Sequence, residues 1–378
     1  METGQKTSSW RTIIRIIVKA AILLLLFNLI FAALRPQESL GRLSLYNSLF
    51  PGRQRLPYGE NAQESYNLSL FNVPAMINSH IASQPKAEDE LRVFIIGDSG
   101  AWGWLLENED TLAAQINELE LTTEDGRQVV AYNLGYPIMS LTKDLMILDA
   151  ALDYDPHLII WPVTLESFPR EKQLFSPIVQ NNPQRIRPLI DRYNLQLDPQ
   201  DSRFVDHSLL QQTIIGQRRD LADLIRLQLY GVSWAATGID QAIPTEISLR
   251  RSDFEEDVGW QEFAEPIRLS ENELAFDVLS GGVTLAGQVP LLIVNEPMFI
   301  SDGLNSDLRY NSFYPRWAYD QYRVMLKDKA AANEWVFIDL WDSIPSAEFT
   351  DTPVHLTPEG TRQLASNLGG IIEELIRQ

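Results

Sequence analysis

Two short segments near opposite ends of the sequence carry residue types suited to nucleophilic chemistry. FIIGDSGAWGW (94–104) places Ser99 in a glycine-rich turn directly after an apolar run. FTDTPVHLTPEG (349–360) places His355 four residues after Asp351. A serine hydroxyl is a weak nucleophile at neutral pH and needs a base, and imidazole titrates in the useful range. The pattern predicts Ser99 as nucleophile, His355 as base and Asp351 as the acid that orients and stabilises the imidazole.

Apolar runs around these segments predict the framework that positions them. LRVFIIG (91–97) is a short run ending in glycine, which is typical of a strand buried on both faces. With helices between them, further strands are expected at 128–135, 157–163, 289–297 and 334–340. Strands that alternate with helices predict an α/β fold of the doubly wound class, with a mainly parallel sheet flanked by helices. Ligands bind at the carboxyl edge of such a sheet, where the strand before Ser99 ends.

Together the two segments resemble the conserved blocks of SGNH (GDSL-like) hydrolases. The resemblance covers residues 91–168 and about 288–378, and it implies an SGNH/flavodoxin-like fold. In that family GDS follows the first strand, a glycine follows the second, an asparagine follows the third, and Asp-x-x-His lies near the C-terminus. The resemblance implies that Ser99 is nucleophile and oxyanion donor, that Gly135 is the second donor, and that His355 is the base. Such a reaction needs no metal and no organic cofactor.

The third block departs from the family pattern. Where an asparagine is expected, the sequence reads WPVTLESF (161–168), so that Thr164, Glu166 or Ser167 occupies that region. Thr164 is the candidate replacement donor, because a carboxylate is a poor oxyanion donor. A donor that is missing and not replaced costs roughly 3–4 kcal/mol of transition-state stabilisation. The C-terminal acid and base are also separated by one residue more than in the family.

An apolar stretch near the N-terminus predicts a membrane anchor. Residues 12–34 are almost wholly apolar, and about 23 residues cover roughly 35 Å as a helix, enough to span a bilayer. Four basic residues precede the apolar centre. The positive-inside rule therefore predicts a single-pass protein with a cytoplasmic N-terminus and an extracytoplasmic main domain. A cleaved signal peptide is the alternative, although no clean A-x-A site follows Leu34.

Composition shifts divide the chain into three parts. Residues 1–35 are the expected tail and transmembrane anchor, 36–90 a Pro- and Gly-containing stalk, and 91–378 the α/β domain. The domain is interrupted by a long insertion at 169–269, with a helix expected around 207–235, which serves as a lid, a substrate platform or a partner surface. Anchor, stalk and insertion look closest to membrane-anchored bacterial envelope members of the family, including those similar to alginate O-acetyltransferases.

Charge and cysteine content exclude several functions. The net charge of −20 argues against a nucleic-acid partner, because phosphate binding needs clustered Lys and Arg. Outside residues 1–35, which hold five basic groups and one acidic group, 26 basic and 50 acidic groups leave a net charge of −24. This excess disfavours tight binding to an anionic lipid surface. With no cysteine, disulfides, thiolate metal sites and cysteine nucleophiles are excluded.

Four further residues are candidates for substrate binding. Trp102 and Trp104 follow the nucleophile, and form either an acyl or sugar platform or part of the core. Glu296 stands at the carboxyl end of an expected strand, as a ligand contact or as part of a turn. Arg316 belongs to a stretch rich in aromatic and Arg residues (309–323), which either binds carbohydrate or carboxylate or packs as a helix.

The expected function is that of a serine-dependent esterase or O-acyltransferase. Its substrate is expected to be an acyl ester of an envelope glycan or a lipid-linked sugar, with the membrane and envelope-assembly proteins as further partners. Hydrolysis and acyl transfer share one covalent intermediate, so both stay open. The alternative is a catalytically inert SGNH-like scaffold that binds glycan or a membrane partner, which the altered third block favours.

Overall fold

A five-stranded sheet forms the centre of this computed structural model, which describes residues 5–43, 47, 52–58, 71–237 and 247–377. Its strands are β1 (Glu90–Ile95), β2 (Gln128–Asn133), β3 (Leu158–Val163), β4 (Leu291–Asn295) and β5 (Val336–Asp339). They lie in the order β2-β1-β3-β4-β5, and every neighbouring pair is parallel. All five predicted strands are confirmed to within two residues at each end.

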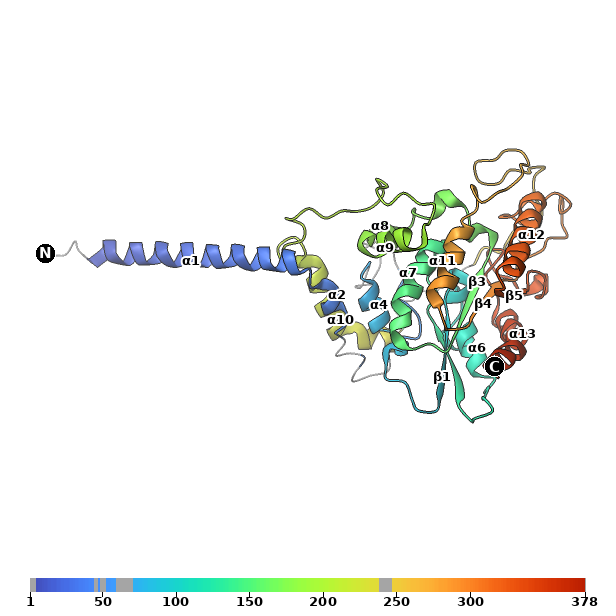
Figure 1. Ribbon diagram of the computed structural model, residues 1–378, viewed down its shortest axis with the longest axis horizontal. Helices are drawn as coiled ribbons and strands as arrows, with labels where there is room; N and C mark the ends of the chain where they lie inside the picture. Colours follow the sequence, from blue (N-terminus) through green and yellow to red (C-terminus); the bar gives the residue numbers. More distant parts are fainter. Residues whose placement is uncertain (1–4, 44–46, 48–51, 59–70, 238–246, 378) are drawn as a thin grey trace.

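Helices cover both faces of the sheet (Figure 1). One face packs against a large apolar core to which α7 (Leu141–Ala151), α11 (Phe276–Ala286) and α12 (Arg316–Ala332) contribute. The other face packs against α6 (Leu112–Asn117) and α13 (Pro358–Ile376), which also contact each other. Strands β1 and β3 are buried along their whole length, as both-face burial requires. The doubly wound α/β class predicted for the chain is thus confirmed.

The insertion begins as part of this core and then departs from it. Its helices α8 (Pro177–Gln180) and α9 (Pro183–Tyr193) bury Ile178, Ile186 and Ile190 in the large core. The expected helix around 207–235 is shorter in the structure, where α10 spans Arg218–Thr237. The ten residues before α10 form turns instead, because Ser208 and Thr213 bond to nearby backbone groups.

The region between the first helix and the sheet differs from the stalk that composition suggested. Leu56 is fully buried, and α4 (Val73–Asn78) contributes Val73, Met76 and Ile77 to the large core. The described part of residues 36–90 therefore packs on the α/β domain. Its apolar residues come in pieces too short to show a period, which is why the sequence indicated a loose connection.

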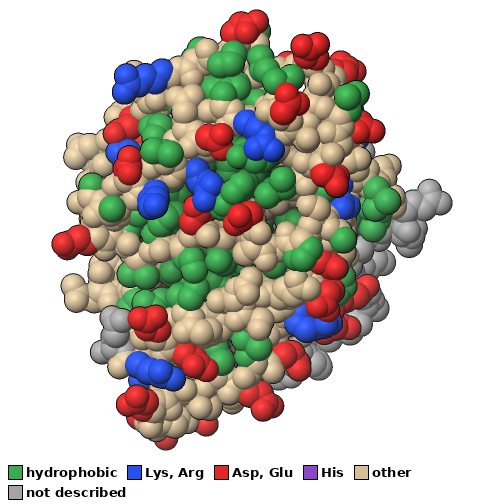
Figure 2. Space-filling view, turned by 90° about the vertical axis from the view of Figure 1, so that its right-hand side faces the viewer, with side chains coloured by type: hydrophobic (Ala, Val, Ile, Leu, Met, Phe, Trp, Pro, Cys, Tyr) green, Lys and Arg blue, Asp and Glu red, His purple; other side chains and the backbone are tan. Residues whose placement is uncertain are grey.

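A single long helix projects from the domain (Figure 1). Helix α1 spans Gln5–Leu34, and its segment Trp10–Leu34 is long and apolar enough to cross a membrane. Of the most apolar 18-residue stretch of this segment, 11% is buried. It leads into α2 (Gln37–Gly41), which contacts α4 and α10. Figure 2 shows the face turned away from α1, where hydrophobic side chains gather near the middle among scattered charged groups.

Candidate active site

The serine turn follows directly on the central strand β1. After the strand, Gly97 and Asp98 lead into the short helix α5 (Ser99–Trp102), so Ser99 lies at the sheet's carboxyl edge. Asp98 caps this helix, because its Oδ1 accepts the Gly100 N–H at 2.8 Å. A Cβ on Gly97 would lie 2.9 Å from the Cβ of Ala101, so only glycine lets the turn close this tightly.

A continuous chain of hydrogen bonds joins Ser99 to the C-terminal loop. The Oγ of Ser99 lies 2.8 Å from Nε2 of His355, and Nδ1 of His355 lies 2.8 Å from Oδ1 of Asp351. Both distances are within the range of a nucleophile–base–acid arrangement. With the carboxylate accepting the Nδ1 proton, Nε2 is left as the acceptor for the serine hydroxyl.

The acid and the base differ in exposure. The His355 side chain is 8% exposed and that of Asp351 is 25% exposed. Burial opposes ionisation of Asp351, but its hydrogen bond and charge interaction with His355 outweigh this and lower its pKa. Asp351 is thus placed as the charged partner of the imidazole.

The loop before His355 accommodates its additional residue by closing on itself. The Thr350 N–H donates to the His355 carbonyl at 2.8 Å, and the Thr350 hydroxyl donates to the same carbonyl at 3.1 Å. The Phe299 N–H holds the loop from outside through the Pro353 carbonyl at 2.7 Å. The four-residue spacing therefore forms a wider loop that still turns Asp351 toward the ring.

Gly135 lies directly against the nucleophile helix. A Cβ at this position would approach the Trp102 backbone nitrogen to 2.5 Å, so glycine is required for the two loops to meet. The Gly135 N–H donates to Oδ1 of Asn133 at 3.1 Å, while Nδ2 of Asn133 donates to the Trp102 carbonyl at 3.1 Å. Among the described residues, the Ser99 N–H donates to no other group. Ser99 thus has a free amide, whereas Gly135 shares its amide with Asn133.

Asn133 is a site residue that the sequence interpretation missed. It ends β2, at the same sheet edge as Ser99, and that position was the available signal. Its side chain links the second strand to the nucleophile helix.

Thr164 lies at the end of β3, but its hydroxyl is already engaged. It is fully buried, and its Oγ1 lies 2.8 Å from the hydroxyl of Tyr314. To act on an oxyanion, Thr164 must give up or share this bond. Its role as a replacement donor stays a prediction.

The two tryptophans after Ser99 occupy different environments. Trp102 is 4% exposed, donates through Nε1 to the Leu56 carbonyl at 2.8 Å, and lies beneath the Arg55 guanidinium. These contacts are those of a core residue, one of the two roles expected for Trp102. Trp104 is partly exposed and stacks on His355 with 6.1 Å between ring centroids and 30° between planes. Trp104 is therefore the aromatic residue beside the base.

The structure separates the other two substrate-binding candidates. Arg316 donates to the Ser306 carbonyl at 2.7 Å and lies over the Tyr310 ring, and within the described residues it has no recorded contact with the triad. Glu296 is 5% exposed, and its Oε2 would lie 3.2 Å from a Cβ on Gly100. Glu296 thus lies beneath the nucleophile turn and not on an open surface.

A buried ion pair, not anticipated from the sequence, supports the strand ends near Ser99. Lys143 is fully buried; its Nζ donates to the carbonyls of Gly97 at 2.6 Å and Tyr136 at 3.0 Å, and it also contacts Asp144. Asp144 accepts the Trp161 Nε1–H at 3.2 Å. Burial raises the pKa of Asp144 to about 6, although the Lys143 charge opposes this. Lys143 thereby ties together the loops that carry Ser99 and Gly135.

Two further carboxyl groups in this region, those of Asp98 and Glu296, are buried close to the serine turn. Burial raises the pKa of Glu296 well above its usual range, and the nearby charges of Asp98 and Asp144 add to the effect. Among the described residues, one oxygen of Asp98 and one of Glu296 have no hydrogen-bond partner. A cavity of about 20 Å³, room enough for one water molecule, has Gly100 and Glu296 among its lining residues. A protonated Glu296 avoids the cost of burying a second unpaired charge.

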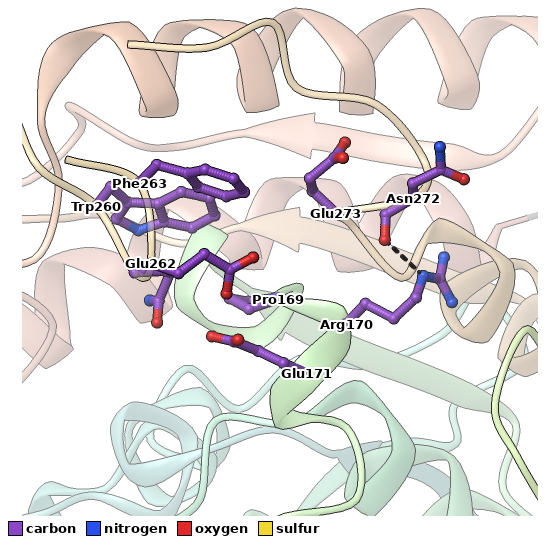
Figure 3. A pocket seen from close by; sticks show the side chains of 9 residues that line it. Pro169, Arg170, Glu171, Trp260, Glu262, Phe263, Asn272 and Glu273 are labelled. Atoms are coloured by element: carbon purple, nitrogen blue, oxygen red, sulfur yellow. Dashed lines mark hydrogen bonds between the residues drawn. The ribbon is translucent and has the colours of Figure 1, made fainter. Parts of the chain in front are cut away.

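A larger pocket of about 290 Å³ lies where the insertion returns to the sheet (Figure 3). The Trp260 and Phe263 rings lie on one side of it, and Arg170, bonded to the Asn272 carbonyl at 3.1 Å, lies on the other. A hydrogen bond with Glu262 raises the pKa of Glu171. No triad residue lines this pocket. Within the described residues, no group of three or more His, Asp or Glu side chains is placed to hold a metal ion.

No protein-family model and no curated protein matches the sequence. In fold the chain is similar to a carbohydrate acetylesterase family member from Sinorhizobium meliloti (12% identity, TM-score 0.34) and to the aryl esterase of M. smegmatis (11%, 0.35). It is also similar to a lipolytic G-D-S-L family member from Veillonella parvula (12%, 0.36). These matches cover 76%, 75% and 74% of this chain and 99%, 99% and 97% of those chains. Because these identities and TM-scores are low, function has to be inferred from this chain's own Ser99, Asp351 and His355.

Proposed function

We propose that this protein is a serine-dependent acyl-ester enzyme of the SGNH type, an esterase or an O-acyltransferase. The observation that carries the proposal is the unbroken chain Asp351–His355–Ser99, with 2.8 Å at each link. A hydroxyl held against a base at the carboxyl edge of a parallel sheet is what nucleophilic acyl transfer requires.

In the first half-reaction, Ser99 Oγ attacks the ester carbonyl carbon while Nε2 of His355 takes the hydroxyl proton. The charge that develops on the imidazole is stabilised by Asp351. The oxyanion is stabilised by the free Ser99 N–H, and by the Gly135 N–H once that amide is shared with or released from Asn133. The intermediate then collapses, the ester C–O bond breaks, and His355 returns the proton to the leaving alcohol. This leaves an acyl group on Ser99.

In the second half-reaction, His355 removes a proton from an incoming hydroxyl, which attacks the acyl carbon. The bond between that carbon and Ser99 Oγ then breaks, and His355 returns the proton to the serine oxygen. Water as the acceptor releases a carboxylic acid, whereas a sugar hydroxyl as the acceptor yields a new ester. The same residues serve both outcomes, so access to the acyl-serine decides between them.

The proposed substrate is an acylated envelope glycan or lipid-linked sugar, outside the cytoplasm. This part rests on the basic flank before the apolar segment of α1 and on the resemblance to envelope members similar to alginate O-acetyltransferases. Protease added to the outside of intact cells should digest the chain beyond residue 36 and leave a membrane-bound fragment. Full-length protein recovered in the soluble cytoplasm would contradict this topology.

Fluorophosphonate labelling of the full chain in detergent tests the enzymatic proposal. The Ser99 oxygen should attack phosphorus and expel fluoride, and the label should be absent from Ser99→Ala. The other serines of the chain act as the internal control, since they are present in both proteins. Equal labelling of wild type and Ser99→Ala would place the nucleophile elsewhere.

A second candidate, an inert SGNH-like scaffold that binds glycan or a membrane partner, is favoured by the third strand. Thr164, which follows β3, is hydrogen-bonded to Tyr314, and this segment contains no asparagine to act as the family's oxyanion donor. The same labelling experiment separates the two functions, because an inert scaffold remains unlabelled in the wild type.

A further inference from the structure

Three large apolar side chains are exposed in the turns that precede α10. Leu209 is 61% exposed, Leu210 is 74% exposed and Ile215 is 54% exposed. We name residues 207–217 the interface segment. Apolar side chains gathered on one exposed segment mark a surface that is covered in use.

Two contacts hold the interface segment against the domain end of α1. The Ile215 N–H donates to Oδ1 of Asn28 at 3.2 Å, and Asn28 is 5% exposed although most of α1 is bare. Three residues after α1 ends, Gln37 at the start of α2 contacts Gln217. Figure 1 shows the chain before α10 meeting the end of α1. Contacts at two points along the chain, Asn28 and Gln37, therefore set the position of the interface segment relative to the membrane helix.

The height of these contacts corresponds to the edge of a bilayer. Trp10–Leu34 has 25 residues, about 37 Å of helix, whereas a hydrocarbon core is about 30 Å thick. The last few residues of the span thus reach the interfacial layer. Asn28 lies six residues before Leu34, which is about 9 Å along the helix. Amphipathic segments that lie on membranes bury their apolar side chains roughly 5–10 Å deep.

We propose that the interface segment inserts Leu209, Leu210 and Ile215 into the outer edge of the bilayer that α1 enters. The occupant is lipid, because the segment lies alongside the membrane helix itself. The domain outside residues 1–35 carries a net charge of −24, so insertion depends on apolar contact and not on anionic headgroups. With α1 as one attachment and this segment as a second, the domain is held in one orientation at the membrane surface.

A single-cysteine probe tests this in the full chain, which has no native cysteine to interfere. Leu210→Cys carries an environment-sensitive fluorophore, with the protein in nanodiscs of phosphatidylcholine alone. Val324→Cys is the matched control, since Val324 is 59% exposed but lies on α12, across the domain from α1 (Figure 1). Unchanged ester turnover or circular dichroism shows that each labelled chain is folded.

The Leu210 probe should show blue-shifted emission and several-fold stronger quenching by lipids with a spin label on the acyl chain than the Val324 probe. Equal emission and equal quenching at the two positions would overturn the proposal. So would a blue shift that appears only in discs with two copies, since the segment would then contact a second chain. Failure of the chain to enter discs would overturn it as well, by removing the membrane helix on which it depends.

Discussion

Two sets of ionisable side chains near Ser99 are built differently. On one side, Asp351 and His355 form a hydrogen-bonded chain that ends at the serine hydroxyl. On the other side, Asp98 and Glu296 are buried and each leaves one oxygen without a partner among the described residues. The first set is open enough to exchange a proton during a reaction. The second is sealed from solvent, and burial raises the pKa of both of its carboxyl groups.

The largest loss of activity should come from substituting Ser99 or His355. Ser99→Ala and His355→Ala should each lower turnover of an aryl acetate by about 10⁴-fold or more, because nucleophile and base act as one unit. Both variants should unfold at close to the wild-type temperature. Steady-state kinetics and thermal unfolding measure the two properties. Wild-type turnover in Ser99→Ala would show that Ser99 is not the nucleophile.

A smaller loss of catalytic activity is expected from Asp351→Ala. The base itself takes the proton, whereas the acid only orients and stabilises it, so we expect roughly a 10- to 1000-fold decrease in kcat/KM. The comparison with His355→Ala on the same substrate is the measurement. An unchanged kcat/KM would mean that another group orients His355 and that the site is a dyad.

Gly135→Ala tests the contact between the second loop and the nucleophile helix. Its methyl group would lie 2.5 Å from the Trp102 nitrogen, and relieving that overlap should cost about 1–3 kcal/mol and shift Ser99. We expect a lower unfolding temperature and reduced turnover. Gly370→Ala is the control, because a Cβ there meets nothing within 4 Å. Equal behaviour of the two variants would show that the loops do not pack as described.

The smallest effect should come from the sealed set, as a change in pH dependence. A carboxyl with a raised pKa in the folded state stabilises the fold below its unfolded pKa and loses that contribution as pH rises through its folded pKa. For Glu296 that window begins at the usual carboxyl pKa and extends well above it, and for the neighbouring Asp144 it runs from about 4 to about 6. The lowered pKa of Asp351 acts in the opposite direction, but only at lower pH.

Glu296→Gln keeps the shape of the side chain but cannot ionise. It should reduce the fall in unfolding free energy as pH rises above the usual carboxyl pKa by on the order of 1 kcal/mol, since each tenfold change in an ionisation constant corresponds to about 1.4 kcal/mol. Denaturant titrations across that range measure it. Glu124→Gln, at an exposed position, is the control. A slope equal to that of wild type would indicate that Glu296 is already ionised in the fold.

Much of the framework was predictable because its signals are local. Each strand is an apolar run of a few residues bounded by turns, and α13 begins where Thr357 and Pro358 form a cap. Ser99 stands out for the same reason, because it begins α5 just after β1, whereas Asp351 and His355 lie in the loop that leads to α13. The described part of the expected stalk packs on the domain, and α10 begins later than expected, since short apolar pieces and side-chain turns show no regular hydrophobic period.

The sequence by itself therefore determined the sheet, the apolar helix and the candidate residues for acyl chemistry. Only the tertiary structure decided how they are held. Lys143 donates hydrogen bonds to carbonyls of the two loops that carry Ser99 and Gly135. Asn133 accepts the Gly135 N–H, and Tyr314 is hydrogen-bonded to the Thr164 hydroxyl. The Tyr314–Thr164 bond joins residues 150 positions apart. Such partners are chosen by proximity in the folded core, where most buried polar groups form hydrogen bonds, and the composition of a local segment carries no record of that choice.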